Sequence, residues 1–187
     1  MEWDLKSFEL IKKINDVQAR LFVSELAVVI KDAYPIAAFH FLVLPWKDID
    51  SVYDLTIGDI SLLQHMEELG WKAVASTGLP KESFDVGYHM QPSQRRLHLH
   101  LVSKDYNSPF LKDPFRWNAF HTDFFIKLDH ILQTLHMNGQ MKKPSHEHTY
   151  SLLVTPLRCN QCSHAPKTFL KLKAHLKQHA EEKNCNT

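Results

Sequence analysis

The chain has 187 residues, 44% apolar and 23% charged, with a formal net charge of +1. This length and composition predict one main soluble, globular domain with room for a small appendage. No apolar run reaches the ~20 residues of a membrane span, the start MEWDLKSFEL is not typical of a secretory signal, and three cysteines do not suggest a disulfide framework.

The first half of the chain predicts two helices that flank a pair of strands. A helix is expected at 5–20 from apolar residues at helical spacing, and strands at 26–31 and 39–45, separated by the turn-forming stretch DAYPIAA. A second helix is expected at 56–76, with Thr56 as its N-cap and a buried apolar stripe.

The second half predicts two more strands and another helix. The strands are expected at 83–90 and 96–103, joined by the loop QPSQR, and the helix at 122–137 with Thr122 as its cap. The stretch at 139–150 contains Gly and Pro without periodicity, which indicates a linker.

This order of elements predicts an α+β fold with a mainly antiparallel sheet. We expect a main domain at 1–138, the linker at 139–150 and a small unit at 151–187. The last unit carries six Lys and Arg against two acids, a net +4, whereas the rest of the chain carries −3. A basic tail favours a polyanion partner, and a solvated lysine face is the alternative.

Cys159, Cys162, His175 and His179 follow the C-x2-C-x12-H-x3-H spacing of a zinc site. A tight CxxC turn presents two thiolates, and histidines four apart share one helix face. The sequence therefore predicts one structural zinc per chain, without which so small a unit does not fold. The alternative is a redox CxxC beside unrelated histidines.

The stretch YHMQPSQRRLHLHLVS carries the second cluster of histidines. On a strand the leucines would face the core, and Arg96, His98 and His100 would face together toward a pocket. Three chemistries fit this pattern. The pair binds zinc if His89 or His40 adds a third ligand, it is structural, or a neutral imidazole attacks phosphorus.

The same stretch resembles the histidine-triad (HIT) nucleotide hydrolases, whose motif is His-φ-His-φ-His-φ-φ with φ apolar. Here the motif is RLHLHLV, with arginine in the first position, and IKDAYPIAAFHFLVLP upstream adds to the likeness. A HIT domain followed by a zinc finger, together with GYHMQPS and LKDPFRWNAFHTDFF, is similar to the aprataxin branch over roughly residues 23–180. The resemblance implies a HIT-like antiparallel sheet with flanking helices and a small C-terminal C2H2-like zinc finger.

The resemblance also implies a reaction. Members of this branch hydrolyse AMP from the 5′ ends of DNA breaks left by abortive ligation, which restores a 5′-phosphate in nuclear DNA repair. Carried over by position, His98 is the nucleophile that forms an adenylyl-histidine. His100 binds the phosphoryl oxygens, His89 protonates or contacts the departing phosphate, and Ser93 binds a phosphate oxygen.

The resemblance implies further binding residues. Asp32 would accept from the ribose hydroxyls, with a turn cap as the alternative, and His40 would support the nucleotide pocket, with a core role as the alternative. DNA is the implied partner and AMP the product, and no partner bound through a phosphopeptide-binding (FHA) domain is expected. The residues expected at the DNA are Arg96, Lys104, Lys112, Arg116, Lys171, Lys173 and Lys177.

Two other functions stay open. A HIT hydrolase of small nucleotides, such as dinucleoside polyphosphates or nucleoside phosphoramidates, explains the histidine strand and leaves the basic finger without a role. A non-enzymatic nucleic-acid-binding protein is supported only by Arg96 in place of the first motif histidine. The sequence leaves undecided the oligomeric state, the preferred DNA or RNA–DNA end, the recruiting partners and the role of the N-terminal helix.

Overall fold

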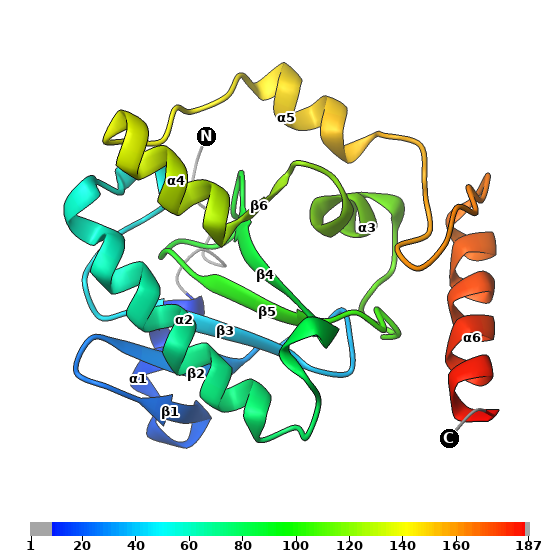
Figure 1. The fold of residues 1–187 in the computed structure, drawn as a ribbon, viewed down its shortest axis with the longest axis horizontal. Helices are drawn as coiled ribbons and strands as arrows, with labels where there is room; N and C mark the ends of the chain where they lie inside the picture. The colour runs from blue at the N-terminus through cyan, green and yellow to red at the C-terminus, as the bar shows by residue number, and fades with distance from the viewer. Residues whose placement is uncertain (1–8, 186–187) are drawn as a thin grey trace.

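An antiparallel sheet forms the centre of the molecule (Figure 1). The computed structural model describes residues 9–185, with side chains as far as Glu182. Across that range the strands pair in the order β1-β2-β3-β5-β4-β6, each antiparallel to its neighbours. The strands are β1 (Arg20–Val23), β2 (Ala27–Lys31), β3 (His40–Pro45), β4 (Phe84–His89), β5 (Leu99–Ser103) and β6 (Phe125–Lys127).

Helices surround this sheet. None of those described is long and apolar enough to cross a lipid bilayer. The helices are α1 (Glu9–Asn15), α2 (Ile60–Ala75), α3 (Pro114–His121), α4 (Leu128–Asn138), α5 (His146–Leu153) and α6 (Phe169–Cys185), and the short 3-10 turns are η2 (Val17–Ala19), η3 (Val52–Asp54), η4 (Ile57–Asp59) and η5 (Lys81–Ser83).

Side chains alternate between the two faces along each strand, and different helices cover the two faces of the sheet. One face packs against α2 and α4, with Val43 and Leu101 in the main core. Helix α2 approaches so closely that a Cβ on Gly70 would lie 2.7 Å from Leu101 Cδ1, so any larger residue there would require Leu101 to shift. On the other face, α1 covers one part through Leu10 and Ile14. Helix α3 covers the part that carries the histidines.

The strands predicted at 26–31, 39–45 and 83–90 are confirmed as β2, β3 and β4. The helix predicted at 56–76 is confirmed as α2, which η4 precedes. Thr56 starts this element through a capping box, in which Asp59 Oδ2 accepts from Thr56 N at 3.0 Å.

The helix predicted at 5–20 is shorter than expected. Helix α1 ends at Asn15, and β1 has begun by Arg20. Residues 1–8, which include the first part of that prediction, lie outside the described residues.

Two further boundaries were wrong. Thr122 ends α3 instead of starting a helix, and its Oγ1 donates to Asn118 O at 2.7 Å. The apolar run after it first forms the short strand β6, and α4 begins only at Leu128. The strand predicted at 96–103 begins only at Leu99. The short apolar run that forms β6 fits a helix and a strand alike, and its pairing with β4 makes it a strand.

The C-terminal part packs directly on the sheet domain through α3, which lies between the sheet and α6 in Figure 1. Leu172 and Leu176 of α6 share one buried core with Trp117 of α3. Trp117 Nε1 also donates to Arg158 O at 3.1 Å. The predicted linker 139–150 contains the start of α5, which crosses the predicted boundary at 151. The domain boundaries themselves stay a prediction.

Candidate active site and metal centre

Three strands bring histidines to the sheet face opposite α2. His40 begins β3, His89 ends β4, and His100 lies within β5. The sheet register places Leu42 of β3 and Gly87 of β4 opposite His100. Because the flanking leucines and Val43 point toward α2, alternation sends the histidines to the other side. Residues 60 apart in sequence thereby come into contact.

His98 lies just before β5 and has a fixed tautomer. Its Nδ1 is 2.7 Å from the carbonyl oxygen of Arg96. A carbonyl only accepts, so Nδ1 carries the proton and Nε2 keeps its lone pair. Burial lowers the pKa of His98 below its usual value, so the ring is neutral at pH 7. A neutral imidazole with a defined free nitrogen is the form that attacks an electrophile.

His40 and His100 form a hydrogen-bonded pair. Nε2 of His40 lies 2.9 Å from Nδ1 of His100. On the far side of His40, Nδ1 lies 3.5 Å from Asp32 Oδ2 and accepts from Ile36 N at 3.4 Å. Nδ1 of His40 thus faces both an acceptor and a donor, and these contacts do not fix its tautomer. In the tautomer in which His40 Nε2 donates to His100 Nδ1, His100 carries its own proton on Nε2, and that nitrogen is a donor.

Two ring nitrogens in this cluster are buried and lack a hydrogen-bond partner among the described residues: Nε2 of His89 and Nε2 of His100. An unsatisfied buried polar atom is costly, so native structures keep few of them, and each calls for an explanation such as a catalytic role or a bound water, ion or ligand. The cavity beside His98 is lined in part by His89, Ser51 and Pro92. The arrangement therefore has an imidazole of fixed tautomer, His98, and a vacant nitrogen on His89 beside a small cavity. The second vacant nitrogen is on His100, whose ring packs against both.

The cluster is electrically neutral. Burial, with a contribution from the neighbouring His98 ring, lowers the pKa of His89 to about 3. Burial lowers the pKa of His40 to about 4 against the opposing pull of Asp32, and it holds the pKa of His100 well below its usual range. Four imidazoles pack this closely because none carries charge at pH 7.

The ring of Phe120, on α3, packs against the histidine cluster. Its ring meets the rings of His40, His89 and His100 edge-to-face, at centroid distances of 5.8, 4.4 and 5.3 Å. We did not expect this residue from the sequence, because we did not predict α3. The start signal was present: Asp113 caps the helix and Pro114 occupies its first turn.

Asp32 and Ser93 differ in their proximity to the cluster. Asp32 accepts from Tyr34 N at 2.8 Å, as a turn cap does, while its other oxygen faces His40. The turn and pocket interpretations of Asp32 are thus compatible. Ser93 is exposed in the loop before His98, and no described residue shares a hydrogen bond with it.

The prediction that Arg96 faces the pocket with His98 and His100 was wrong. Arg96 has a φ of 86°, which breaks the alternation expected of a strand. Its guanidinium turns toward the loop after β3, where Nη2 lies 3.1 Å from Asp48 Oδ1. The DNA contact assigned to Arg96 stays a prediction, and its side chain is already engaged.

Three other residues of the sheet domain that were predicted to contact DNA lie near the C-terminal unit. Each of these cations has an intramolecular contact. Lys104 Nζ donates to Glu82 O at 2.8 Å. Arg116 Nη1 donates to Phe110 O at 2.6 Å, and Lys112 Nζ lies 5.9 Å from the centre of the Phe110 ring.

The three lysines of α6 that were predicted to contact DNA divide into two groups. Lys173 points back to the sheet domain, where its Nζ donates to Ser108 O at 3.1 Å and Leu111 O at 3.2 Å. Lys171 and Lys177 are exposed. Of these three lysines, only Lys171 and Lys177 can therefore bind a polyanion without losing a side-chain contact to another described residue.

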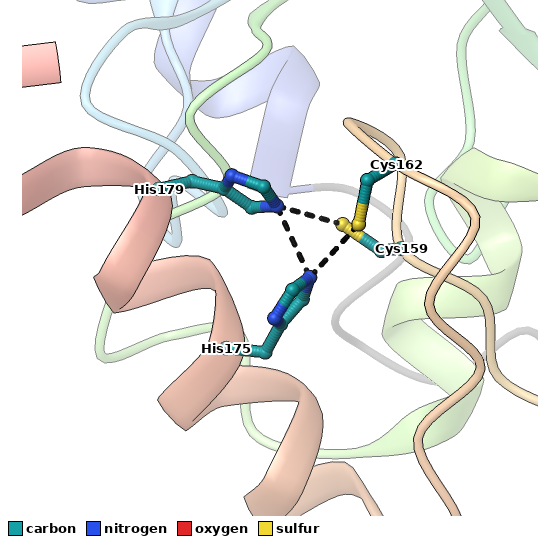
Figure 2. Close-up of side chains that lie close together, drawn as sticks. All are labelled: Cys159, Cys162, His175 and His179. Carbon is teal, nitrogen blue, oxygen red and sulfur yellow. Dashed lines mark hydrogen bonds between the residues drawn. The ribbon is translucent and has the colours of Figure 1, made fainter. Parts of the chain in front are cut away.

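The four predicted metal ligands converge (Figure 2). Cys159 and Cys162 come from a turn, and His175 and His179 from adjacent turns of α6. Cys162 Sγ lies 3.1 Å from His175 Nε2, the two Nε2 atoms are 3.1 Å apart, and Cys159 Sγ lies 3.6 Å from His179 Nε2.

This donor set fits a tetrahedral zinc ion. Zn–S bonds of about 2.3 Å and Zn–N bonds of about 2.0 Å place tetrahedral ligand atoms roughly 3.3–3.8 Å apart. All four ligand atoms lie within 4.8 Å of one another. Two thiolates and two imidazoles are also the ligand types of structural zinc sites.

Family comparisons identify both halves of the chain. The model described as scavenger mRNA decapping enzyme C-term binding matches residues 6–115, more than half of the chain. A model described as C2HE / C2H2 / C2HC zinc-binding finger matches residues 121–182. This second match begins before α4, upstream of the boundary predicted at 151.

Individual relatives agree with these families. The chain is 38% identical to aprataxin of Gallus gallus over 172 residues, covering 91% of the chain and 54% of that protein. It is 38% identical to aprataxin of Danio rerio over 167 residues, covering 89% and 51%. The chain thus spans about half the length of these relatives.

Solved structures share the fold. The crystal structure of aprataxin ortholog Hnt3 from Schizosaccharomyces pombe superposes with a TM-score of 0.72 at 25% identity, covering 95% of this chain and 92% of that one. A structure of aprataxin ortholog Hnt3 in complex with DNA gives a TM-score of 0.73 at 24% identity, covering 96% and 94%. The predicted HIT-like α+β fold with a C-terminal zinc-finger domain is confirmed.

Proposed function

The chain belongs to the scavenger mRNA decapping enzyme C-term binding family of histidine-triad domains and is an aprataxin homologue. On that premise we propose that it is a DNA-5′-adenylate hydrolase. Its substrate would be DNA with AMP joined to a 5′-phosphate through a pyrophosphate, and its products AMP and a 5′-phosphate end. DNA repair in the nucleus is the setting that fits this substrate.

The observation that carries the proposal is the fixed tautomer of His98. Nε2 of His98 attacks the AMP phosphorus, the P–O bond to the DNA 5′-phosphate breaks, and that phosphate leaves with the electron pair. A covalent adenylyl-histidine remains. As the ring becomes cationic, its Nδ1–H strengthens its hydrogen bond to Arg96 O, which stabilises the charge that develops.

The neighbouring histidines support this step. His100 Nε2, buried and without a described partner, donates to a nonbridging phosphoryl oxygen as negative charge builds up. His89 Nε2 contacts the departing phosphate, and Ser93 in the exposed loop binds another phosphate oxygen. Water then attacks the adenylyl-histidine, releasing AMP and regenerating neutral His98.

Nucleotide and DNA contacts complete the proposal. Asp32 accepts from the ribose hydroxyls and His40 orients His100. The DNA backbone meets the cations near the junction of the two parts of the chain, and exposed Lys171 and Lys177 supply salt-dependent affinity.

We further propose one structural zinc ion per chain, held by Cys159, Cys162, His175 and His179. When bound, zinc cross-links the CxxC turn to α6. Metal analysis of purified protein should give one zinc per chain, and two would point to a second site in the histidine cluster.

A direct assay tests the proposed activity. The protein is incubated with a nicked duplex carrying a 5′-adenylate, and released AMP and the ligatable 5′-phosphate are quantified. Rapid acid quenching followed by intact-mass analysis should detect the adenylylated protein. Absence of both AMP and adduct under conditions where the DNA is bound would refute the proposal.

A second function has one observation in its favour. The finger packs into the same core as α3, so it serves the enzyme structurally even without DNA. A hydrolase of small nucleotides therefore no longer leaves the finger without a role. Competing adenylated nicked DNA against a dinucleoside polyphosphate in one reaction separates the two, and preference for the dinucleotide favours the small-nucleotide enzyme.

A further inference from the structure

Arg96 stands where the histidine-triad motif has its first histidine, and its conformation is unusual. Its φ of 86° lies in the left-handed region, which a long L side chain rarely adopts. Its side chain is only 12% exposed despite carrying a permanent charge. A strained backbone and a buried guanidinium at one residue persist only where neighbouring groups hold both.

The loop after β3 supplies those groups. Arg96 Nη1 donates to the carbonyls of Pro45 at 3.4 Å and Trp46 at 3.3 Å, while Nη2 pairs with Asp48 at 3.1 Å. The next residue adds a backbone hydrogen bond, since Leu97 N donates to an oxygen of the same loop, Ile49 O, at 2.8 Å.

The carbonyl of Arg96 faces the opposite way, toward the catalytic cluster. It accepts from His98 Nδ1 at 2.7 Å. This direction of the carbonyl goes with the left-handed backbone at Arg96.

We propose that Arg96 is a positioning residue that acts through His98: its guanidinium anchors a left-handed backbone, and the backbone carbonyl thereby holds His98 in the Nδ1–H tautomer. This inference rests on the proposed role of His98 as nucleophile. A planar guanidinium with five donors serves two carbonyls and a carboxylate together. A neutral imidazole has one donor, so a histidine at this position would secure the loop differently.

The carbonyl also matters when His98 gains charge. The hydrogen bond from Nδ1 raises the pKa of His98 against the lowering effect of burial. Arg96 therefore both selects the tautomer of the ground state and stabilises the cationic ring of the adenylyl intermediate.

A matched pair of variants tests the proposal. Arg96→Ala removes the anchor, and Arg95→Ala removes the same charge one residue earlier, where the side chain pairs with Asp50 at 2.6 Å. On an adenylated nicked duplex, Arg96→Ala should lower kcat about 10- to 100-fold, by analogy with the loss of a group that orients a metal-ligating histidine. KM should change less than threefold, and Arg95→Ala should keep kcat within about twofold of wild type.

Two further variants protect the test against misfolding. Arg96→Gly accepts a positive φ without strain and lacks the guanidinium. Arg96→Lys keeps the charge and loses the planar fork. Both should fold, as judged by circular dichroism and thermal melting, and both should lose kcat, with glycine losing more than lysine.

A spectroscopic measurement gives a readout that does not need activity. In wild-type protein, ¹⁵N shifts of the His98 ring at pH 7 should show a single tautomer with Nδ1 protonated, and in Arg96→Gly a mixture. A single unchanged tautomer in folded Arg96→Gly, or kcat within twofold of wild type, would overturn the inference. Inactive wild-type protein with the expected tautomers would instead reject the proposed function and leave the positioning role intact.

Discussion

The histidine cluster on the sheet and the candidate metal centre each contain a close pair of histidines, yet the two are built in different ways. His175 and His179 lie one helical turn apart, with Nε2 atoms separated by 3.1 Å. His40 and His100 lie 60 residues apart and meet at 2.9 Å only because β3 and β5 pair in a particular register. Local spacing defines the first pair, and tertiary structure defines the second.

The chemistry of the two pairs also differs. The metal centre offers four ligand atoms that converge, with two cysteines beside the histidines. The catalytic cluster has vacant nitrogens on His89 and His100 and an imidazole of fixed tautomer on His98. One arrangement suits a cation, and the other suits a phosphoryl group.

The largest expected effect tests the catalytic side of this comparison. His98→Ala removes the attacking nitrogen, so AMP release from adenylated nicked DNA should fall by at least about 10³-fold, because no other residue supplies the covalent step. DNA affinity and zinc content should stay near wild type. Activity above a few per cent would move the nucleophile elsewhere, with His100 the next suspect.

The metal side gives the next effect. Cys159→Ser removes one ligand, so the turn and α6 should separate, and the melting temperature should fall by several degrees. Because Leu172 and Leu176 share a core with Trp117, turnover of a small adenylyl substrate should fall together with turnover of DNA.

This outcome separates two roles of the C-terminal unit. Ser163→Ala, in the same turn and outside the four ligands, is the matched control and should leave both activities unchanged. If Cys159→Ser loses activity on DNA and keeps full activity on the small substrate, then the unit is a DNA clamp that does not brace the catalytic domain.

The same difference explains how much of each region the sequence predicted. All four metal ligands were predicted from spacing, because a CxxC turn and two histidines on one helix are local features. His89, His98 and His100 were assigned through the family motif, and strand alternation placed His100 correctly. It failed for Arg96, since a left-handed residue resets the alternation. Phe120 was missed because its contacts exist only after α3 folds over the sheet.

The pH dependence of stability should report on the buried histidines of the sheet. Folded-state pKa values of about 4 for His40 and about 3 for His89 lie below the unfolded value of 6.5. Below pH 6.5 the unfolded chain therefore binds more protons than the folded chain, and stability falls with pH until the folded rings titrate. At about 1.4 kcal/mol per unit, His40 alone would cost up to about 3 kcal/mol by pH 4.

Urea unfolding at pH 7, 6 and 5 measures this slope. His40→Leu should reduce the loss of stability between pH 7 and pH 5, since one buried titrating ring is gone. His130→Asn changes an exposed residue of α4 and should leave the slope unchanged. Equal slopes in wild type and His40→Leu would mean that His40 binds a proton at the same pH in the folded and the unfolded protein.

The smallest expected effect concerns the packing of Phe120 on the His40–His100 pair. Phe120→Leu keeps an apolar side chain and removes the ring that meets three histidines edge-to-face. Such ring contacts contribute about 1 kcal/mol, so unfolding should become easier by that amount and kcat should fall about 2- to 10-fold as the imidazoles gain freedom. Phe115→Leu, an exposed site on the same helix, should change neither. If both variants behave alike in chemical denaturation and single-turnover kinetics, then strand pairing alone orients the histidines, and α3 serves only as the seat of the C-terminal unit.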